Sequence, residues 1–121
     1  MQHANKFLAL VDECLVRIKE VSVEEASVAT RGGPAVLVDV REDREWVAGH
    51  AVGAVHIGKG VIERDIERLY PDPETPLYCY CGGGYRSALV AEALQKMGYT
   101  KVYSVAGGIK AWAEAGLPLE N

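Results

Sequence analysis

The sequence predicts a single α/β domain: a central, mostly parallel β-sheet of about five strands with helices on both faces, plus an extra N-terminal helix. Short apolar runs alternate with segments whose apolar residues recur at helical spacing, the pattern expected of a parallel sheet. Of the 121 residues, 49% are apolar, which is enough to bury one core of ordinary size. The sequence contains no internal repeat, long linker or low-complexity tract.

The first predicted element is an amphipathic helix at residues 5–19. We expect residues 1–20 to pack as a helix on a domain of residues 21–121, in preference to binding a partner or forming a dimer. The apolar stripe of this helix consists of Phe7, Leu10, Val11, Cys14, Leu15 and Ile18. Cys14 is most simply a small core residue on that stripe. Ser22 can then cap a second short helix, which the glycines and proline of residues 31–34 end.

A buried parallel strand is predicted at residues 35–40, a continuous apolar run that contains one acid, Asp39. Since an unpaired buried charge is costly, Asp39 needs a partner, and Arg41 or Arg44 can supply it. Ligands bind at the carboxyl ends of strands in open α/β sheets, so Asp39 and Arg41 are candidate supporting residues of a site. A structural ion pair at the strand end is the favoured interpretation.

Residues 42–48 predict a short helix with Trp46 and Val47 facing inward, and residues 49–57 predict a turn and a short strand. His50 and His56 have no recognisable ligand spacing with the cysteines, so we interpret both as structural hydrogen-bonding side chains. The remaining predicted elements are a helix within 61–69, a strand at 77–80, a helix from Ser87 to Gly98, a last strand at 101–105 and a helix from Gly107 to Gly116.

Cys81 stands where the strand at 77–80 ends and a helix is about to begin. It is followed by a loop of Gly82, Gly83, Gly84, Tyr85, Arg86 and Ser87. The glycines lack a Cβ, so successive N–H groups can turn inward as an anion-binding loop at the positive end of a helix. A thiol at the mouth of such a loop, close to Arg86, is expected to exist more as nucleophilic thiolate. We therefore predict Cys81 as the catalytic nucleophile and the loop as its anion-binding site.

Charge and cysteine content further narrow the range of possible functions. The net charge is −4 and there is no basic run, so neither a nucleic acid nor an anionic membrane is indicated as a partner. The three cysteines, Cys14, Cys79 and Cys81, do not form a disulfide framework. Neither a signal peptide nor a spanning helix is predicted, so we expect a cytoplasmic protein with reduced thiols. Cys79 could resolve an oxidised Cys81, but buried packing is the stronger expectation.

Four segments, in this order, resemble single-domain rhodaneses, the sulfurtransferase family. They are residues 37–42, residues 45–57, the Cys81 loop at residues 80–87, and Gly107-Gly108-Ile109 with Trp112 and Gly116-Leu117-Pro118. The resemblance spans residues 22–118 and leaves out the N-terminal helix. It implies the rhodanese-like fold and a thiosulfate sulfurtransferase. Cys81 would attack the outer sulfur of thiosulfate, expel sulfite and become a persulfide held by the N–H groups of residues 82–87.

The resemblance also implies the partners and cofactors. The persulfide would pass to cyanide, to a small thiol or to a protein sulfur acceptor, and no cofactor or metal would be needed. A monomer or a weak homodimer is expected. Gly82 stands where many thiosulfate-using relatives carry a basic residue, and Cys81-Gly82-Gly83-Gly84 resembles the loop of mercaptopyruvate sulfurtransferases. The donor could therefore be 3-mercaptopyruvate.

Other functional classes are open at this point. One is a non-catalytic binding module or a persulfide carrier; the intact cysteine and glycine loop speak against the non-catalytic form. Another is a phosphatase or arsenate reductase of the same fold. Phosphatase loops place five residues between cysteine and arginine, whereas four residues separate Cys81 from Arg86. Arg86 would either recognise the anionic group of the donor or point to solvent, and Tyr85 would form the rim of the pocket.

Overall fold

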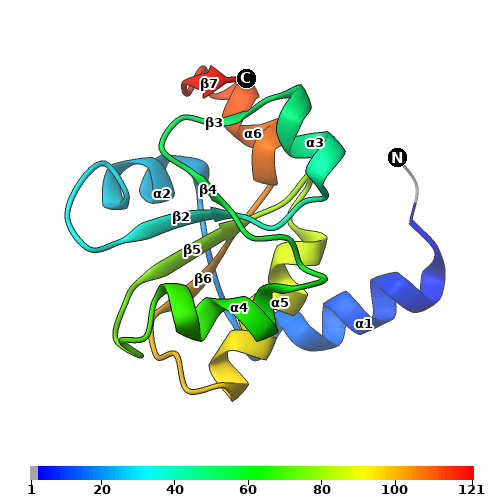
Figure 1. The fold of residues 1–121 in the computed structure, drawn as a ribbon. Helices are drawn as coiled ribbons and strands as arrows, with labels where there is room; N and C mark the ends of the chain where they lie inside the picture. The colour runs from blue at the N-terminus through cyan, green and yellow to red at the C-terminus, as the bar shows by residue number, and fades with distance from the viewer. Residues whose placement is uncertain (1–2) are drawn as a thin grey trace.

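The computed structural model describes residues 3–121, with a five-stranded parallel sheet at the centre (Figure 1). The sheet order is β1-β6-β5-β2-β4, from β1 (Lys19–Val21), β2 (Val36–Asp39), β4 (Val55–His56), β5 (Leu77–Tyr80) and β6 (Val102–Val105). A separate antiparallel pair joins β3 (His50–Ala51) and β7 (Leu119–Glu120). Strand β5, which ends just before Cys81, is the middle strand of the sheet. The predicted α/β fold class is confirmed.

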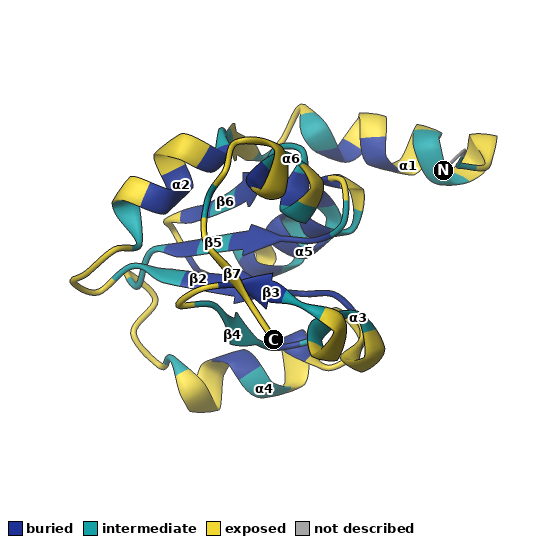
Figure 2. Cartoon of the chain, turned by 90° about the horizontal axis from the view of Figure 1, so that it is seen from above, coloured by how far each residue is buried: buried dark blue, intermediate teal, exposed yellow. Residues whose placement is uncertain are grey.

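The helices cover both faces of the sheet. They are α1 (Asn5–Leu15), α2 (Val23–Ala29), α3 (Asp43–Ala48), α4 (Ile62–Leu69), α5 (Tyr85–Lys96) and α6 (Gly108–Glu114). Helices α4 and α5 pack on one face, where Val38 and Cys79 belong to their core cluster. Helices α2 and α6 pack on the other face, around Leu37 and Tyr80. Figure 2 shows the central strands β2, β5 and β6 as mainly buried and the edge strand β4 as intermediate.

The N-terminal helix is shorter than predicted. It ends at Leu15 because Lys19–Val21 pair in parallel with residues 103–105 and form an edge strand that the sequence did not reveal. Helix α1 packs on α5, where Val11 and Cys14 are buried against Ala88. Cys14 is therefore the core residue that its position predicted. Leu10, assigned to the same stripe, is instead 53% exposed.

Helix α2 begins as its sequence predicts. The backbone N–H of Glu25 donates to Ser22 Oγ at 3.1 Å, and the Glu25 side chain accepts from the N–H of Ser22 in return. This reciprocal capping box satisfies two N–H groups that the first turn would otherwise leave unpaired. The Ser22 cap and the first turn of α2 thus fix the point at which the chain leaves β1 and begins the helix that packs on the sheet.

Helix α3 lies at one end of the sheet, and only one of the two side chains predicted to face inward does so. Trp46 turns inward and stacks on His50 with 3.4 Å between ring centroids, whereas Val47 is 70% exposed. Residues 49–57 contain two short strands in different sheets instead of one, because β3 pairs with β7 and β4 pairs with β2. Within residues 3–121, no helix combines the length and apolar character needed to cross a membrane.

A buried ion pair closes the carboxyl end of β2. Asp39 is fully buried, and its carboxylate accepts from Nε and Nη2 of Arg41 at 3.1 and 2.8 Å. Arg41 Nη2 also donates to the carbonyl of Gly49 at 2.7 Å, which ties β2 to the segment after α3. Arg41, not Arg44, is thus the partner of Asp39.

Replacing Asp39 with Asn keeps the shape of the side chain but leaves the Arg41 guanidinium buried without its counter-charge. Breaking a buried ion pair from one side costs about 3–5 kcal/mol, so we expect a loss of that order in the free energy of unfolding. Urea denaturation measures it. Asp12→Asn, at an exposed position, should change the free energy by less than about 0.5 kcal/mol. A loss no larger in Asp39→Asn than in this control would contradict the structural role of the pair.

Candidate active site

Cys81 occupies the first position after β5, at the carboxyl edge of the parallel sheet. Gly84 adopts the left-handed conformation, with φ of 101°, and is the N-cap of α5. A Cβ on Gly84 would lie 3.1 Å from the backbone nitrogen of Gly107, a tight contact, and the left-handed backbone itself favours glycine at this position. The chain therefore turns sharply from strand to helix and places the thiol inside the turn.

The Cys81 sulfur is surrounded by hydrogen-bonding groups of its own loop. The backbone N–H groups of Gly84 and Ser87 donate to Sγ at 3.2 and 3.4 Å. The Ser87 hydroxyl lies 3.5 Å from Sγ and 2.8 Å from the hydroxyl of Ser104 on β6. Both serines are fully buried. Two of the N–H groups predicted from the loop sequence thus point at the sulfur, and N–H groups in this position stabilise negative charge on it.

The start of α6 holds the carbonyl groups of the same loop. The N–H of Ile109 donates to the Cys81 carbonyl at 2.8 Å, and the N–H of Lys110 donates to the Gly82 carbonyl at 3.3 Å. These bonds turn the carbonyl oxygens toward α6, away from the sulfur. The contact requires glycine at Gly108, because a Cβ there would lie 2.3 Å from the Cys81 carbonyl oxygen.

Arg86 lies at the edge of the cleft that reaches Cys81, and it binds a carboxylate of the chain, a partner that its sequence position did not reveal. Its guanidinium makes two hydrogen bonds to the carboxylate of Glu45 in α3, at 2.7 and 3.0 Å. The hydrogen bond from Arg86 lowers the pKa of Glu45 from 4.5 to about 2, so the pair is ionised at neutral pH. Two N–H donors of the predicted anion-binding arginine are therefore used by a carboxylate of the chain.

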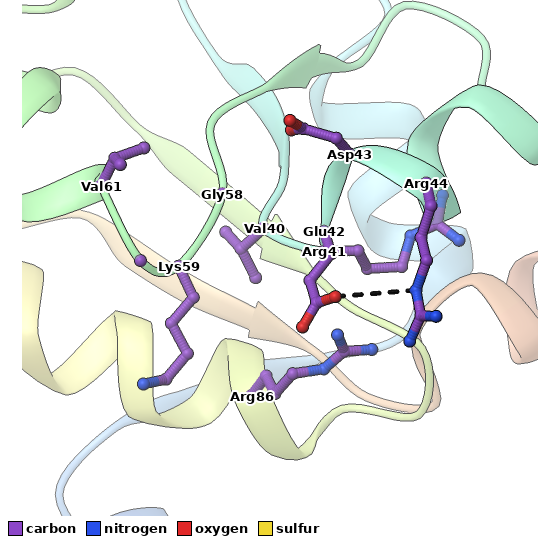
Figure 3. Close-up of a pocket in the computed structure, with 10 residues that line it drawn as sticks. Val40, Arg41, Glu42, Asp43, Arg44, Gly58, Lys59, Val61 and Arg86 are labelled. Atoms are coloured by element: carbon purple, nitrogen blue, oxygen red, sulfur yellow. Dashed lines mark ion pairs between the residues drawn. The ribbon is translucent and has the colours of Figure 1, made fainter.

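Two clefts open beside this ion pair. One, of about 820 Å³, reaches Cys81 and is lined among others by Phe7, Tyr85 and Lys110. The second, of about 570 Å³, lies over the end of β2 and includes Lys59. Figure 3 shows Glu42, Lys59 and Arg86 around the second cleft, with the ion pair between Arg44 and Glu42 at 3.7 Å. Glu42, Arg44 and Arg86 line both clefts, so these side chains separate them.

The other two cysteines have different surroundings. Cys79 is fully buried, and burial, with the neighbouring Cys81 as a smaller contribution, raises its pKa to about 12. Burial also raises the pKa of Cys14, whose thiol donates to the carbonyl of Ala88 at 3.1 Å. Both remain protonated at neutral pH and neither lines the Cys81 cleft.

The remaining sequence candidates lie outside the immediate surroundings of the sulfur. Asp39 and Arg41 bond to each other, and Arg41 also donates to the carbonyl of Gly49, so both lie at the end of β2 and have no hydrogen bond to Sγ. Their supporting role stays a prediction. His50 Nδ1 and His56 Nε2 lie 3.0 and 2.8 Å from the carbonyls of Trp46 and Arg41, the structural role that was predicted. Within residues 3–121 no cluster of three or more His, Cys, Asp or Glu side chains could hold a metal ion.

Two residues of the site were missed from the sequence. Glu45 lies in a predicted surface helix, and nothing local indicates that α3 folds over the loop. Ser104 is a polar residue within an apolar strand, which is a usable signal for a buried hydroxyl that needs a partner. Its partner, Ser87, is 17 residues away in the sequence, so only the order of the strands brings them together.

Comparisons with known proteins place the chain among domains of this architecture. The family model of the rhodanese-like domain matches residues 22–115. A protein of unknown function from Rhodopseudomonas palustris, named a possible tyrosine phosphatase, is 28% identical, with a TM-score of 0.86 over 99% of this chain and 98% of that one.

Two sulfur-transferring proteins are also similar. The polysulfide-sulfur transferase homodimer of Wolinella succinogenes is 27% identical, with a TM-score of 0.80 over 95% of this chain and 87% of that one. The thiosulfate sulfurtransferase of Pseudomonas aeruginosa is 26% identical, with a TM-score of 0.79 over 93% of this chain and 22% of that longer chain.

Gly108→Ala should disturb the loop around Cys81. The new Cβ would collide with the Cys81 carbonyl at 2.3 Å, whereas the same substitution at Gly116, which also has a positive φ, meets nothing within 4 Å. Left-handed backbone alone costs about 1–3 kcal/mol, and the collision adds to it only at Gly108. We expect a greater loss of thermal stability and a changed rate of Cys81 alkylation in Gly108→Ala than in Gly116→Ala. Equal behaviour of the two variants would contradict the proposed fit.

The ion pair of Glu45 and Arg86 should stabilise the fold in a pH-dependent way. The folded-state pKa of Glu45 lies below its ordinary value, so the stabilisation is complete above pH 4.5 and is lost as the pH falls toward about 2. We expect the difference in unfolding free energy between wild type and Glu45→Gln to be constant from about pH 5 to 8 and to shrink below about pH 4.5. Denaturant titrations across that range measure it, and a difference that grows on acidification would contradict the pairing.

Proposed function

The chain belongs to the rhodanese-like domain family, and we propose that it is a sulfurtransferase that carries sulfane sulfur as a persulfide on Cys81. The observation that carries the proposal is the pair of N–H groups, from Gly84 and Ser87, directed at Sγ. A persulfide relay needs a site that stabilises negative charge on sulfur. The site must also have room for the small outer sulfur of the persulfide, with no bulky side chain against it. A loop of glycines at a helix N-terminus supplies both properties.

The proposed reaction has two steps. In the first, the Cys81 thiolate attacks the outer sulfur of the donor, a new S–S bond forms, and the donor leaves with the electron pair of the broken bond; from thiosulfate the product is sulfite. In the second, cyanide or a thiolate attacks the outer sulfur of the persulfide and releases the Cys81 thiolate. Splitting the transfer in this way is covalent catalysis. Gly84 and Ser87 would stabilise the anionic sulfur in both steps, and losing one such donor costs about 3 kcal/mol in comparable sites.

The donor is proposed to be thiosulfate or a related anionic sulfur compound such as 3-mercaptopyruvate. Since Arg86 is paired with Glu45, the cations left in the Cys81 cleft are Arg44, which makes only a loose exposed pair with Glu42, and Lys110. These exposed groups suit a weakly bound anion that enters and leaves with each turnover. The similar proteins are named for polysulfide and thiosulfate transfer, which supports the same donor class here.

Phosphatase chemistry is the competing proposal, favoured by the name of the similar Rhodopseudomonas palustris protein. A phosphate ester would need an arginine clamp over the nucleophile. Here Arg86 makes its two hydrogen bonds to Glu45, and only four residues separate it from Cys81. Both features favour sulfur over phosphoryl transfer. A cytoplasmic location, a monomer or weak dimer, and a protein acceptor stay predictions from the sequence.

Intact-protein mass spectrometry after brief thiosulfate treatment tests the proposal. We expect wild type to gain the mass of one sulfur, cyanide to remove it with release of thiocyanate, and Cys81→Ser to gain nothing. Cys79→Ser, at a buried position off the cleft, is the control and should still load. An adduct with mercaptopyruvate alone would change the donor and keep the mechanism. No adduct from either donor, with aryl phosphate hydrolysis lost in Cys81→Ser, would replace the proposal with a phosphatase.

A further inference from the structure

The N-terminal segment forms one wall of the cleft that leads to Cys81. His3 and Phe7 line this cleft together with Tyr85, although both lie before residue 22, where the match to the family model begins. Helix α1 is positioned by its packing on α5, the helix that begins at the catalytic loop (Figure 1). The segment that the family pattern does not include therefore contributes directly to the surroundings of the nucleophile.

Three aromatic rings make up this wall. The ring centroids of His3 and Tyr85 lie 4.5 Å apart, those of His3 and Phe7 5.3 Å apart, and those of Phe7 and Tyr85 6.3 Å apart, all tilted. Tyr85 also covers the loop, since its ring carbons lie 3.6 and 3.8 Å from the position of a Cβ on Gly83. Tyr85 is nevertheless 37% exposed, so part of its ring stays open to the cleft. We call the rings of His3, Phe7 and Tyr85 the aromatic wall.

The cleft is much larger than the small ions of the proposed reaction require. Its volume is about 820 Å³, and cavities of about 300–1,000 Å³ are those that enclose drug-sized organic molecules. The aromatic wall lines it together with charged side chains of both signs, among them Arg44, Lys110 and Glu114. Planar apolar groups gain the most binding energy from such a wall. Tilted or offset aromatic rings attract one another, and this attraction adds to the energy gained by burying apolar area.

We propose that the aromatic wall binds the sulfur acceptor, and that this acceptor is an organic thiol with a planar, apolar body. The inference rests on the proposed persulfide relay and names the substrate class of its second step. The acceptor sulfur, as thiolate, attacks the outer sulfur of the Cys81 persulfide. A new S–S bond forms in the organic persulfide, the old S–S bond breaks, and its electron pair returns to Cys81 as thiolate. The acceptor's proton goes to solvent.

Binding of a non-reactive probe tests the wall without any sulfur chemistry. Benzyl methyl sulfide has the planar body and sulfur of an acceptor but no thiol. We expect NMR titration of wild type to shift the amide signals of Phe7 and Tyr85, and Phe7→Leu to weaken binding about 3- to 10-fold. Phe7→Leu keeps an apolar side chain for packing α1 and removes only the ring. The control, Leu15→Ala, loosens the same packing cluster away from the cleft and should bind as wild type does.

Acceptor kinetics extend the test to the reaction. After loading with thiosulfate, the ratio of kcat/KM for phenylmethanethiol to that for cyanide should fall about 3- to 10-fold in Phe7→Leu and stay unchanged in Leu15→Ala. An unchanged ratio in Phe7→Leu, or no probe binding by wild type, would overturn the inference. If wild type binds the probe at the wall but never forms a persulfide on Cys81, the proposed function fails while the binding site stands.

Discussion

The site depends on the hydrogen bonds from the start of α6 to the carbonyls of Cys81 and Gly82. A peptide group has two polar ends, and a carbonyl oxygen turned toward Sγ would repel the thiolate that an N–H stabilises. The N–H groups of Ile109 and Lys110 take those carbonyls, and Gly108 allows the approach because it has no Cβ. This arrangement depends in turn on sheet order: β6 lies beside β5, so the helix after β6 begins next to the loop after β5.

The ion pairs within the chain determine which charged side chains are left to bind a substrate. Arg41 and Arg86 each hold a carboxylate of the chain, one pair fully enclosed at the end of β2 and the other partly exposed at the rim of both clefts. The arginines closest in sequence to Cys81 and to β2 thus each bind a carboxylate of the chain. The groups within hydrogen-bonding distance of Sγ are two backbone N–H groups and the Ser87 hydroxyl, which are small, fixed and uncharged. Such donors fit a single sulfur atom, whereas a phosphoryl group with three oxygens calls for a free guanidinium.

The sequence predicts most features that depend on neighbouring residues. It predicts few features that depend on contacts between segments far apart along the chain. The buried strand at residues 77–80, the Ser22 cap and the position of Cys81 follow from apolar runs, capping chemistry and glycine, and the structure agrees with each. The edge strand at Lys19–Val21 has too few apolar residues to be recognised from its sequence, and its pairing with β6 joins segments that are distant along the chain. The partner of Arg86 is 41 residues away, on a helix whose placement the sequence pattern does not specify. Roles assigned to the individual loop residues stay predictions.

Cys79 and Cys81 show how two positions along the chain give a thiol different surroundings. They stand two residues apart, and both are almost inaccessible in the folded chain. Cys79 is enclosed by apolar side chains within β5, where burial raises its pKa to about 12 and keeps it a neutral packing group. Cys81 stands one residue beyond the last strand pairing, where peptide N–H groups no longer serve the sheet and two of them reach Sγ. The end of the strand therefore gives Cys81 hydrogen-bonding surroundings that Cys79 lacks.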